Sequence, residues 1–176
     1  KLEVYNTNTV IKKLLSHDTN IGIITGFHEF KNITTVPILS DRLLLVSGPY
    51  EEHSEIYIEE VLNIPLILRE GDASYRAVLA NILLKPGINL DDLNTVLSSN
   101  SPESIKSTVA SGRGFAFLPE VVIKQELRRG ILKQIEIKDF DANFSYYFAY
   151  RNNYEFKGYE KTFKNFITSK KRCFCY

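Results

Sequence analysis

Apolar and polar stretches alternate along the chain in a way that predicts strands and helices in turn. Between residues 93 and 119, a strand (Thr95–Ser98) precedes a polar turn, a short helix and a second apolar strand (Phe115–Leu118). Ser101 stands where a helix N-cap belongs, and Pro102 occupies the first helical position, where a missing N–H costs nothing. A strand–helix–strand unit of this kind predicts parallel strands and a right-handed crossover.

The helix in this unit should have one buried face and a defined end. Ile105 and Val109 lie four residues apart, so they share a face. Gly112, directly after Ser111, suits the left-handed conformation that ends many helices. In sheets with parallel strands, ligands bind beyond the carboxyl ends of the strands, beside helix N-termini. The residues at that place are small and polar: Ser98, Ser99 and Asn100.

The first quarter of the chain repeats this pattern. Lys1–Tyr5 alternates as a strand does, and residues 10–15 carry an apolar helix face. Ile21–Thr25 is a continuous apolar run, which is typical of a strand buried on both faces. A second strand–helix–strand unit is therefore expected here. The turn between its first strand and its helix contains Thr7, Asn8 and Thr9.

The remaining pattern predicts four helices and five strands. The strands are Val36–Leu39, Arg42–Ser47, Pro65–Arg69, Leu132–Ile137 (an edge strand) and Asn143–Tyr150. The helices are Glu51–Leu62, Tyr75–Leu84, Pro119–Arg129 and Gly158–Ser169. A third polar turn lies between a strand and a helix, and it contains Gly71, Asp72, Ala73 and Ser74.

Composition narrows the function classes. The 176 residues carry a net charge of +1, which argues against nucleic-acid binding by bulk electrostatics. No apolar run is long enough to span a bilayer. The chain starts at Lys1 and has no Met, so we expect a piece of a longer protein. Cys173 and Cys175 form a single terminal pair, which is poor for zinc, and the absence of other cysteines suits a reducing compartment.

Other candidate chemistry is weak. The histidines are scattered and read as surface residues, so neither a metal nor a cofactor is expected; they are His17, His28 and His53. Arg113, between two glycines, is a turn residue, and no nucleophile or phosphate-binding motif joins a strand to a helix. The aromatic strand Phe144–Tyr150 admits two readings. It could stack nucleic-acid bases, but its modest flanking charge favours packing in the core and between lobes.

The order of these segments resembles the effector-binding (regulatory) domain of LysR-type transcriptional regulators. The resemblance covers nearly the whole chain and rests on NTNTVIKKLL…NIGIITG, PLILREGDASYR and SPESIKSTVASGRGFAFLPEVVIKQELRRGIL. The third block matches in the spacing of Val109, Gly112, Gly114, Leu118, Pro119 and Gly130. Two departures stand out. Asp72-Ala73 replaces the usual Gly-Ser, and the family's first strand, first helix and DNA-binding winged helix-turn-helix do not match any part of this chain.

The resemblance implies an α/β, two-lobed periplasmic-binding-protein-like (type 2) fold. Each lobe would be a mixed, mostly parallel sheet flanked by helices. The first lobe would comprise residues 1–46 and 147–176, and the second residues 48–142. Two crossing segments, near Val46–Pro49 and Asp139–Asn143, would form the hinge.

The polar turns then define an expected effector site between the lobes. Each turn precedes a helix, whose free N–H groups and dipole favour a small anionic metabolite. The expected residues are Thr7, Asn8, Thr9, Gly71, Asp72, Ala73, Ser74, Ser98, Ser99 and Asn100. For any single Ser or Thr, helix capping alone is the competing explanation. Asp72 repels an anion, so it points outward, caps its helix or meets an amine of the ligand.

The expected function is therefore ligand sensing in a bacterial transcription regulator. Such a domain is cytoplasmic, not enzymatic, forms a homodimer or tetramer, and reaches DNA only through a separate domain, with no membrane partner. An extracytoplasmic solute-binding protein of a transporter shares the fold and is the alternative. An enzyme on the same scaffold would need a nucleophile–base pair or a metal cluster at the cleft, and the sequence offers neither.

Overall fold

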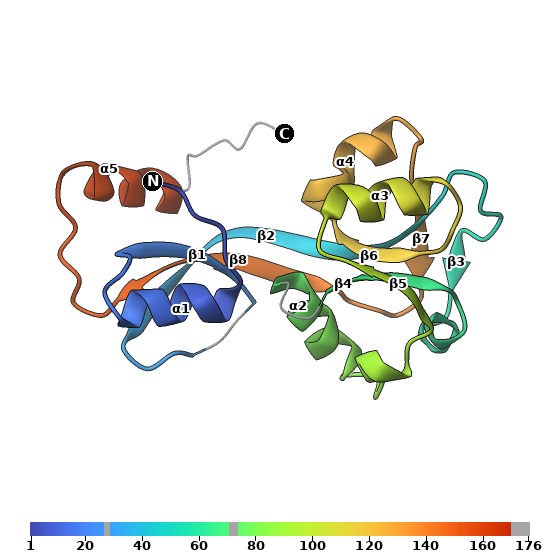
Figure 1. Ribbon diagram of the computed structural model, residues 1–176, viewed down its shortest axis with the longest axis horizontal. Helices are drawn as coiled ribbons and strands as arrows, with labels where there is room; N and C mark the ends of the chain where they lie inside the picture. The colour runs from blue at the N-terminus through green and yellow to red at the C-terminus, as the bar shows by residue number, and fades with distance from the viewer. Residues whose placement is uncertain (27–28, 71–73, 170–176) are drawn as a thin grey trace. The chain divides into compact units, whose positions relative to one another are not determined.

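The computed structural model describes residues 1–26, 29–70 and 74–169, with two compact α/β units (Figure 1). Unit 1 contains Lys1–Ser40 and the chain from Phe144 on, and unit 2 contains Asp41–Asn143. The division falls within one long strand and at the start of another. Some residues singled out from the sequence lie outside the described residues: His28, Gly71, Asp72, Ala73, Cys173 and Cys175.

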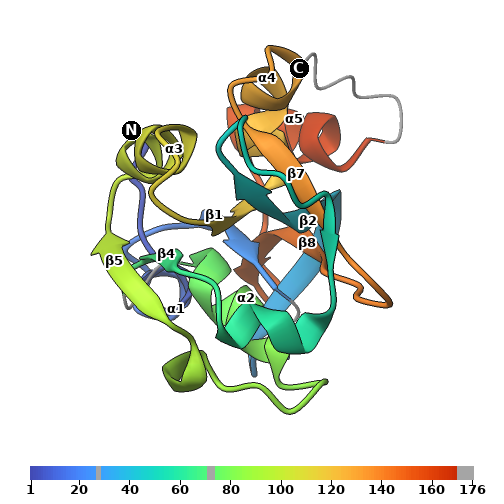
Figure 2. The same cartoon turned by 90° about the vertical axis from the view of Figure 1, so that its right-hand side faces the viewer.

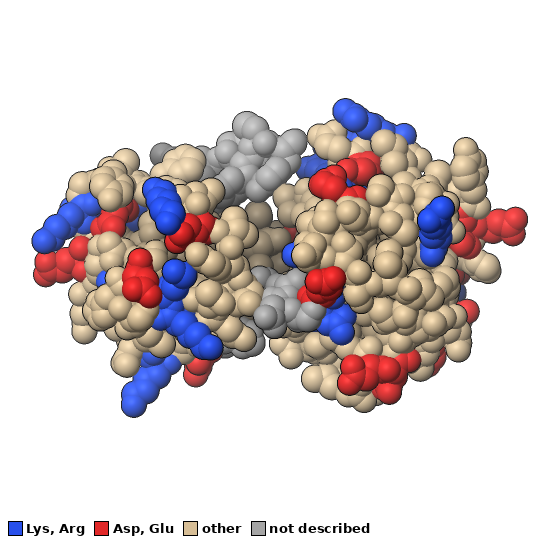
Figure 3. Space-filling model, viewed as in Figure 1, with Lys and Arg blue, Asp and Glu red and all other residues tan. Residues whose placement is uncertain are grey.

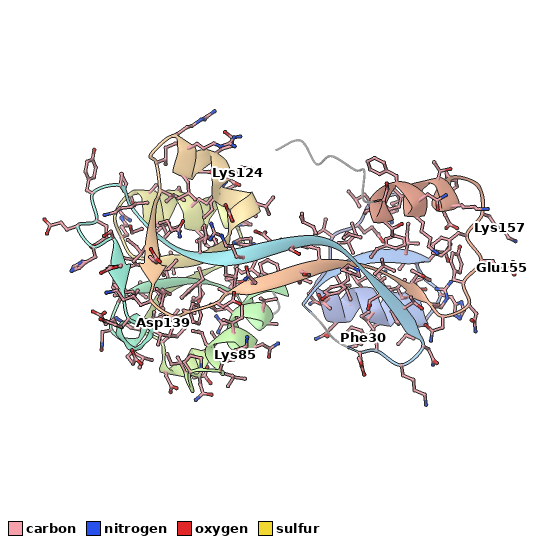
Figure 4. All side chains as sticks on the ribbon, turned by 180° about the vertical axis from the view of Figure 1, so that it is seen from behind. Phe30, Lys85, Lys124, Asp139, Glu155 and Lys157 are labelled. Carbon is pink, nitrogen blue, oxygen red and sulfur yellow. The ribbon has the colours of Figure 1, made fainter. Side chains whose placement is uncertain are left out.

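Unit 1 is a sheet with two helices. Its elements are α1 (Thr7–Leu15), β1 (Ile21–Thr25), the first part of β2 (Ile33–Ser47), β8 (Asn143–Arg151) and α5 (Gly158–Thr168). β8 lies between β1 and β2 in the strand order. β1 and β8 are antiparallel, with Ile23 opposite Phe148. In the loop from β8 to α5, the exposed Glu155 and Lys157 flank Phe156, whose ring packs on Tyr150 with centroids 4.8 Å apart (Figure 4).

Two core clusters hold unit 1 together. The side chains of Ile11 and Leu14 from α1 are buried against Ile24, Ile33 and Ala149 of the sheet. On the α5 side, Phe148 is buried with Ile38 and Ile167. The apolar helix face expected for residues 10–15 is confirmed at Ile11 and Leu14 but not at Leu15, which is 44% exposed.

Two predictions for unit 1 are wrong. Residues 1–6 form no strand, and the side chains of Leu2 and Val4 are 92% and 88% exposed. A strand needs a partner for its backbone hydrogen bonds, and none of the described strands pairs with this segment. β1 is also not buried on both faces, since Ile23 is 48% exposed. The apolar run therefore predicted the strand correctly but not how far its side chains are buried.

Unit 2 contains most of the secondary structure. Besides the second part of β2, its elements are β3 (Glu55–Ile56), the 3-10 helix η1 (Ile58–Leu62), β4 (Leu66–Arg69), α2 (Ser74–Leu83), the 3-10 helix η2 (Leu90–Asp92), β5 (Thr95–Ser99), α3 (Pro102–Ala110), β6 (Ala116–Pro119), α4 (Glu120–Arg128) and β7 (Lys133–Ile137). Figure 2 shows β5 beside β4, with α3 following β5.

The strands of unit 2 form a mixed arrangement. β2 is antiparallel to both β6 and β7, and β7 is parallel to β3. β4 is parallel to β5, and a parallel bridge from Leu66 to Phe115 joins β4 to the segment entering β6. β5 and β6 therefore run in the same direction, as predicted, with β4 between them. β7 is an inner strand and not the predicted edge strand.

Two other predictions for this region are wrong. Val36–Leu39 and Arg42–Ser47 are parts of one strand, because β2 continues through Ser40 and Asp41. The segment Glu51–Leu62 is not one helix. Ile56 instead pairs with Ile137 in β7, which holds the backbone extended before the short η1.

The core of unit 2 confirms the central strand–helix–strand reading. Ile105 and Val109 are buried with Val46, Ile67, Leu118 and Ile123, among others. Ser101 caps α3, and Gly112 has φ = +76°. Gly114 allows a close approach, because a Cβ there would lie 2.6 Å from the carbonyl oxygen of Pro65.

Candidate functional site

Some polar groups of the turn before α1 are already hydrogen-bonded within unit 1. The Thr7 hydroxyl accepts a hydrogen bond from the Thr25 N–H at 3.3 Å, which ties the start of α1 to the end of β1. Asn6 caps the helix, since its side chain accepts from the Thr9 N–H at 2.8 Å. Asn8 is exposed, and the side chains of Asn8 and Thr9 make no hydrogen bond within the described part of the chain. Of the three predicted residues here, Asn8 and Thr9 are the ones with unused side-chain groups.

The turn after β5 has a similar division of roles. Ser101 caps α3 by accepting from the Ser104 N–H at 3.2 Å, and Ser99 accepts from the Ser101 N–H at 3.1 Å. The exposed Ser98 and Asn100 make no side-chain hydrogen bond to any described residue. Helix capping therefore explains the position of Ser101. The side chains of Ser98 and Asn100 have no such role and are available to a ligand.

The structure brings the ends of β4 and β5 together within unit 2. Arg69 lies opposite Ser99 in the parallel register, and the Glu70 N–H donates to the Ser99 carbonyl at 3.1 Å. Each strand leads by a short turn into a helix, α2 or α3. The predicted residues Gly71, Asp72 and Ala73 lie outside the described residues. Ser74 is the first residue of α2, and its side chain is not described.

Arg69 and Tyr75 are candidate site residues that the sequence interpretation missed. The Arg69 guanidinium lies over the Tyr75 ring, with Cζ 5.5 Å from the ring centroid. Arg69 Nε and Tyr75 Oη are both buried, and neither has a hydrogen-bond partner of good geometry among the described residues. Arg76 adds a second cation, which donates from Nη1 to the Arg69 carbonyl at 3.2 Å.

The electrostatics of this cluster favour an anion. Burial raises the pKa of Tyr75 to about 12, and the Arg69 charge and its hydrogen bond with Tyr75 oppose the rise only in part. Tyr75 is therefore a neutral hydroxyl at physiological pH, able to donate. Neither Arg69 nor Arg76 forms an ion pair with a carboxylate of the described residues. By contrast, acidic and basic side chains are interspersed over the visible face of each unit (Figure 3).

Two cavities lie away from these residues. One of about 530 Å³ in unit 2 is lined by Ser47–Glu51, Pro65 and Ala110–Phe115. It includes Arg113 and the glycine turn but none of the predicted effector residues. Another, of about 520 Å³ in unit 1, is lined mainly by apolar side chains such as Leu2, Ile23 and Phe163. Neither is lined by a described side chain that has a buried polar atom without a hydrogen-bond partner, as Arg69 and Tyr75 do.

Metal and membrane sites find no support in the described residues. No group of three His, Cys, Asp or Glu side chains within 1–26, 29–70 and 74–169 is placed to hold a metal ion. His53 is exposed and its Nδ1 lies 2.7 Å from Glu51. None of the described helices is both long and apolar enough to cross a membrane.

Comparison of the sequence with known families places the chain among regulators. Residues 1–171 match the family described as the LysR substrate binding domain. A probable RuBisCO transcriptional regulator of Cyanophora paradoxa is 29% identical over 145 residues, which cover 79% of this chain and 45% of that protein. The uncharacterized HTH-type transcriptional regulator YeiE of Escherichia coli is 27% identical over 139 residues, or 78% of this chain and 46% of YeiE. The chain thus spans about half the length of the curated relatives it matches.

Solved structures support the same fold. The Synechocystis PCC6803 CcmR regulatory domain in complex with 2-PG has a TM-score of 0.82 and 20% identity, covering 96% of this chain and 81% of that one. The effector binding domain of QuiR in complex with shikimate has a TM-score of 0.75 and 15% identity, covering 93% and 77%. The expected α/β, periplasmic-binding-protein-like (type 2) fold is confirmed. Because the family match extends over residues 1–171, the chain belongs to the LysR substrate-binding domain family.

Proposed function

We propose that this chain is the effector-sensing part of a bacterial transcription regulator and that its effector is a small anionic metabolite. The family assignment supports the sensing role. The observation that carries the choice of site is the pairing of β4 and β5, whose carboxyl ends lie together and lead into α2 and α3. Helix N-termini present unpaired N–H groups and a positive dipole end, which favour anions.

In this proposal the effector contacts both units. Unit 1 contributes the turn before α1, and unit 2 contributes the turns before α2 and α3. The residues proposed to line the site are Thr7, Asn8, Thr9, Gly71, Asp72, Ala73, Ser74, Ser98, Ser99 and Asn100. Support comes from the unused side-chain groups of Thr9, Ser98 and Asn100, since polar groups at a helix N-terminus otherwise serve as caps.

Effector binding would act on the rest of the protein by shifting a conformational equilibrium. A ligand shifts such an equilibrium only as far as it prefers one arrangement of the units over another. The regulator would pass that preference to a separate DNA-binding domain, which changes the spacing of the paired DNA-binding elements on the operator. The CcmR domain was solved with 2-PG and the QuiR domain with shikimate, which supports a small-molecule effector for this chain.

The assembly and location follow from the same proposal. We propose a cytoplasmic homo-oligomer, a dimer or a tetramer, that reaches DNA only through the separate domain. Light scattering on the full-length protein should report at least a dimer, and a strict monomer at high concentration would contradict this part. A solute-binding protein of a transporter shares the fold, but the named relatives are transcriptional regulators.

The experiment is a metabolite screen followed by calorimetry. Small organic acids and phosphorylated acids, with 2-PG and shikimate among them, are tested for a rise in melting temperature. The strongest hit is then titrated into the wild type, Thr9→Val and Ser99→Ala. Each substitution removes a hydroxyl, so binding should weaken by about 1–3 kcal/mol if a buried partner is left unpaired.

Thr162→Val is the matched control. Its hydroxyl is exposed on α5 and bonds only to the Gly158 carbonyl of the same helix, so effector affinity should not change. Equal affinity of the wild type, Thr9→Val and Ser99→Ala would mean that the effector binds elsewhere, and the proposed site would be rejected.

A further inference from the structure

Arg69 differs from Arg42 and Arg151, whose guanidinium groups are paired within the described residues. Arg42 forms an ion pair with Glu120 at 2.7 Å. Arg151 donates to the carbonyls of Leu14 and Thr19 at 2.7 Å and to Asn20 at 3.1 Å. The Arg69 side chain forms no ion pair with a described residue; its contact is with Tyr75, and its buried Nε has no hydrogen-bond partner among the described residues.

Leaving buried donors unpaired is costly for the fold. A buried polar group without a hydrogen bond destabilises a protein, and the penalty is larger for a charged group. The adjacent Tyr75 has a similar group, because its hydroxyl is also buried and lacks a well-aligned hydrogen-bond partner among the described residues. The two contacting side chains therefore keep hydrogen-bonding capacity that a bound oxyanion would use.

The surroundings of this pair are rich in donors. Arg69 ends β4 opposite Ser99, and Tyr75 lies in the first turn of α2. Arg76 donates from Nη1 to the Arg69 carbonyl, and its guanidinium makes no other hydrogen bond or ion pair with a described residue. Among the described residues, the carboxylate nearest in sequence is Glu70, which is exposed and not in an ion pair.

We propose that the Arg69 guanidinium and the Tyr75 hydroxyl bind the acidic group of the effector, a carboxylate or a phosphate, at the carboxyl ends of β4 and β5. This inference rests on the proposed function and names the group that the site recognises. A guanidinium presents a planar fork of donors that matches two oxygens of a carboxylate or phosphate. The neutral Tyr75 hydroxyl donates to a further oxygen.

The inference concerns unit 2 alone, because Arg69, Tyr75 and Ser99 all belong to it. The effector class is a small hydroxylated or otherwise polar organic acid, or a phosphorylated one.

The test measures oxyanion binding directly, without knowing the effector. Inorganic phosphate and acetate are titrated separately into the ¹⁵N-labelled chain, and amide shifts are followed by NMR. The wild type should show saturable shifts near Arg69, Tyr75 and Ser99 for at least one anion. The anion that binds more tightly distinguishes a phosphate-bearing effector from a carboxylate.

Four variants assign the binding. Arg69→Gln should weaken the affinity by roughly tenfold or more, as expected for losing a bond to a charged group. Arg69→Lys should lose less, because it keeps the charge but not the fork. Tyr75→Phe should weaken the affinity severalfold while keeping the ring under the guanidinium. Arg113→Gln, an equal charge change at an exposed turn of the same unit, should bind as the wild type does.

The outcomes separate this inference from the proposed function. Equal saturation of wild type and Arg69→Gln would reveal an adventitious ion only, and an absence of saturable binding by the wild type would equally overturn the inference. In both cases the effector screen with Thr9→Val and Ser99→Ala still decides the proposed function. If the spectrum of Arg69→Gln shows that this variant is not folded, the anion affinities of Arg69→Lys and Tyr75→Phe test the inference instead. Wild-type anion affinity in both variants would reject the assignment of the site.

Discussion

Tyr154 donates a hydrogen bond from its hydroxyl to Glu160 Oε2 over 2.7 Å. The bond joins the loop after β8 to the first turn of α5. Asn20 donates to the other carboxylate oxygen at 2.9 Å, and Arg151 lies over the Tyr154 ring at 5.1 Å. Segments that are 140 residues apart in the sequence are thus held by one carboxylate.

Loss of the Tyr154 hydroxyl should destabilise unit 1. Tyr154→Phe removes a donor to a charged acceptor, so we expect the free energy of unfolding to fall by about 1–3 kcal/mol. Urea denaturation measures the change. Tyr159→Phe is the control, because Tyr159 is 85% exposed, and it should leave the midpoint unchanged. Equal midpoints for Tyr154→Phe and the wild type would mean that the bond adds nothing to stability.

The same carboxylate should make stability depend on pH. The hydrogen bonds from Tyr154 and then Asn20 lower the pKa of Glu160 below its ordinary value of 4.5. A lowered folded-state pKa stabilises the fold above pH 4.5, and that stabilisation is lost as pH falls through the folded-state value. The difference in unfolding free energy between wild type and Glu160→Gln should therefore be largest near neutral pH and shrink in acid. A difference that is constant from neutral to acidic pH would contradict this.

Tyr75→Phe should behave in the opposite way to Tyr154→Phe. The Tyr75 hydroxyl is buried without a well-aligned partner in the described residues, so replacing it with hydrogen removes an unfavourable burial. We expect the unliganded variant to be more stable than the wild type by about 1 kcal/mol. Thermal denaturation in an anion-free buffer is the measurement. A drop in stability would show that the hydroxyl has a partner in solution that holds it in place.

Gly112 should be required for its backbone conformation and not for space. Its φ is +76°, and no atom of the described residues lies within 4 Å of the place that a Cβ would take, so the cost of a side chain there is conformational. Gly112→Val should destabilise unit 2 by about 1–3 kcal/mol. Gly112→Asn should recover part of the loss, because Asn tolerates the left-handed region. If both variants unfold at the same denaturant concentration as the wild type, the left-handed conformation is not needed there.

The candidate site was predicted in part from the sequence. Strand-end reasoning identified the turn before α3, because β5 and the helix that follows it are both visible in the local pattern. The turn before α1 was chosen from a predicted strand at residues 1–5 that does not form. The same reasoning passed over Arg69 and Tyr75. The sequence predicts Tyr75 only as the first residue of an apolar helix. The alternation of β4 does not predict which side chain contacts its last residue, Arg69.

Features governed by near neighbours in the sequence were determined by the sequence itself. The ends of α3 depend on contacts within about four residues, so the local sequence is enough to predict them. They are Ser101 as the cap, Pro102 as the first helical residue and Gly112 as the helix end. The burial of Ile105 and Val109 follows from the helix period in the same way.

Features that need a distant partner were decided only by the tertiary structure. Residues 1–5 alternate like a strand but pair with none of the described strands. By contrast, β2 runs unbroken through the polar Ser40 and Asp41 and pairs with β8 and β7. Arg69 and Tyr75 are only six residues apart, but the periodicity of neither β4 nor α2 predicts that their side chains meet. Strand pairing and side-chain contacts are set by residues far away in the chain, and a local pattern carries no information about which of them will meet.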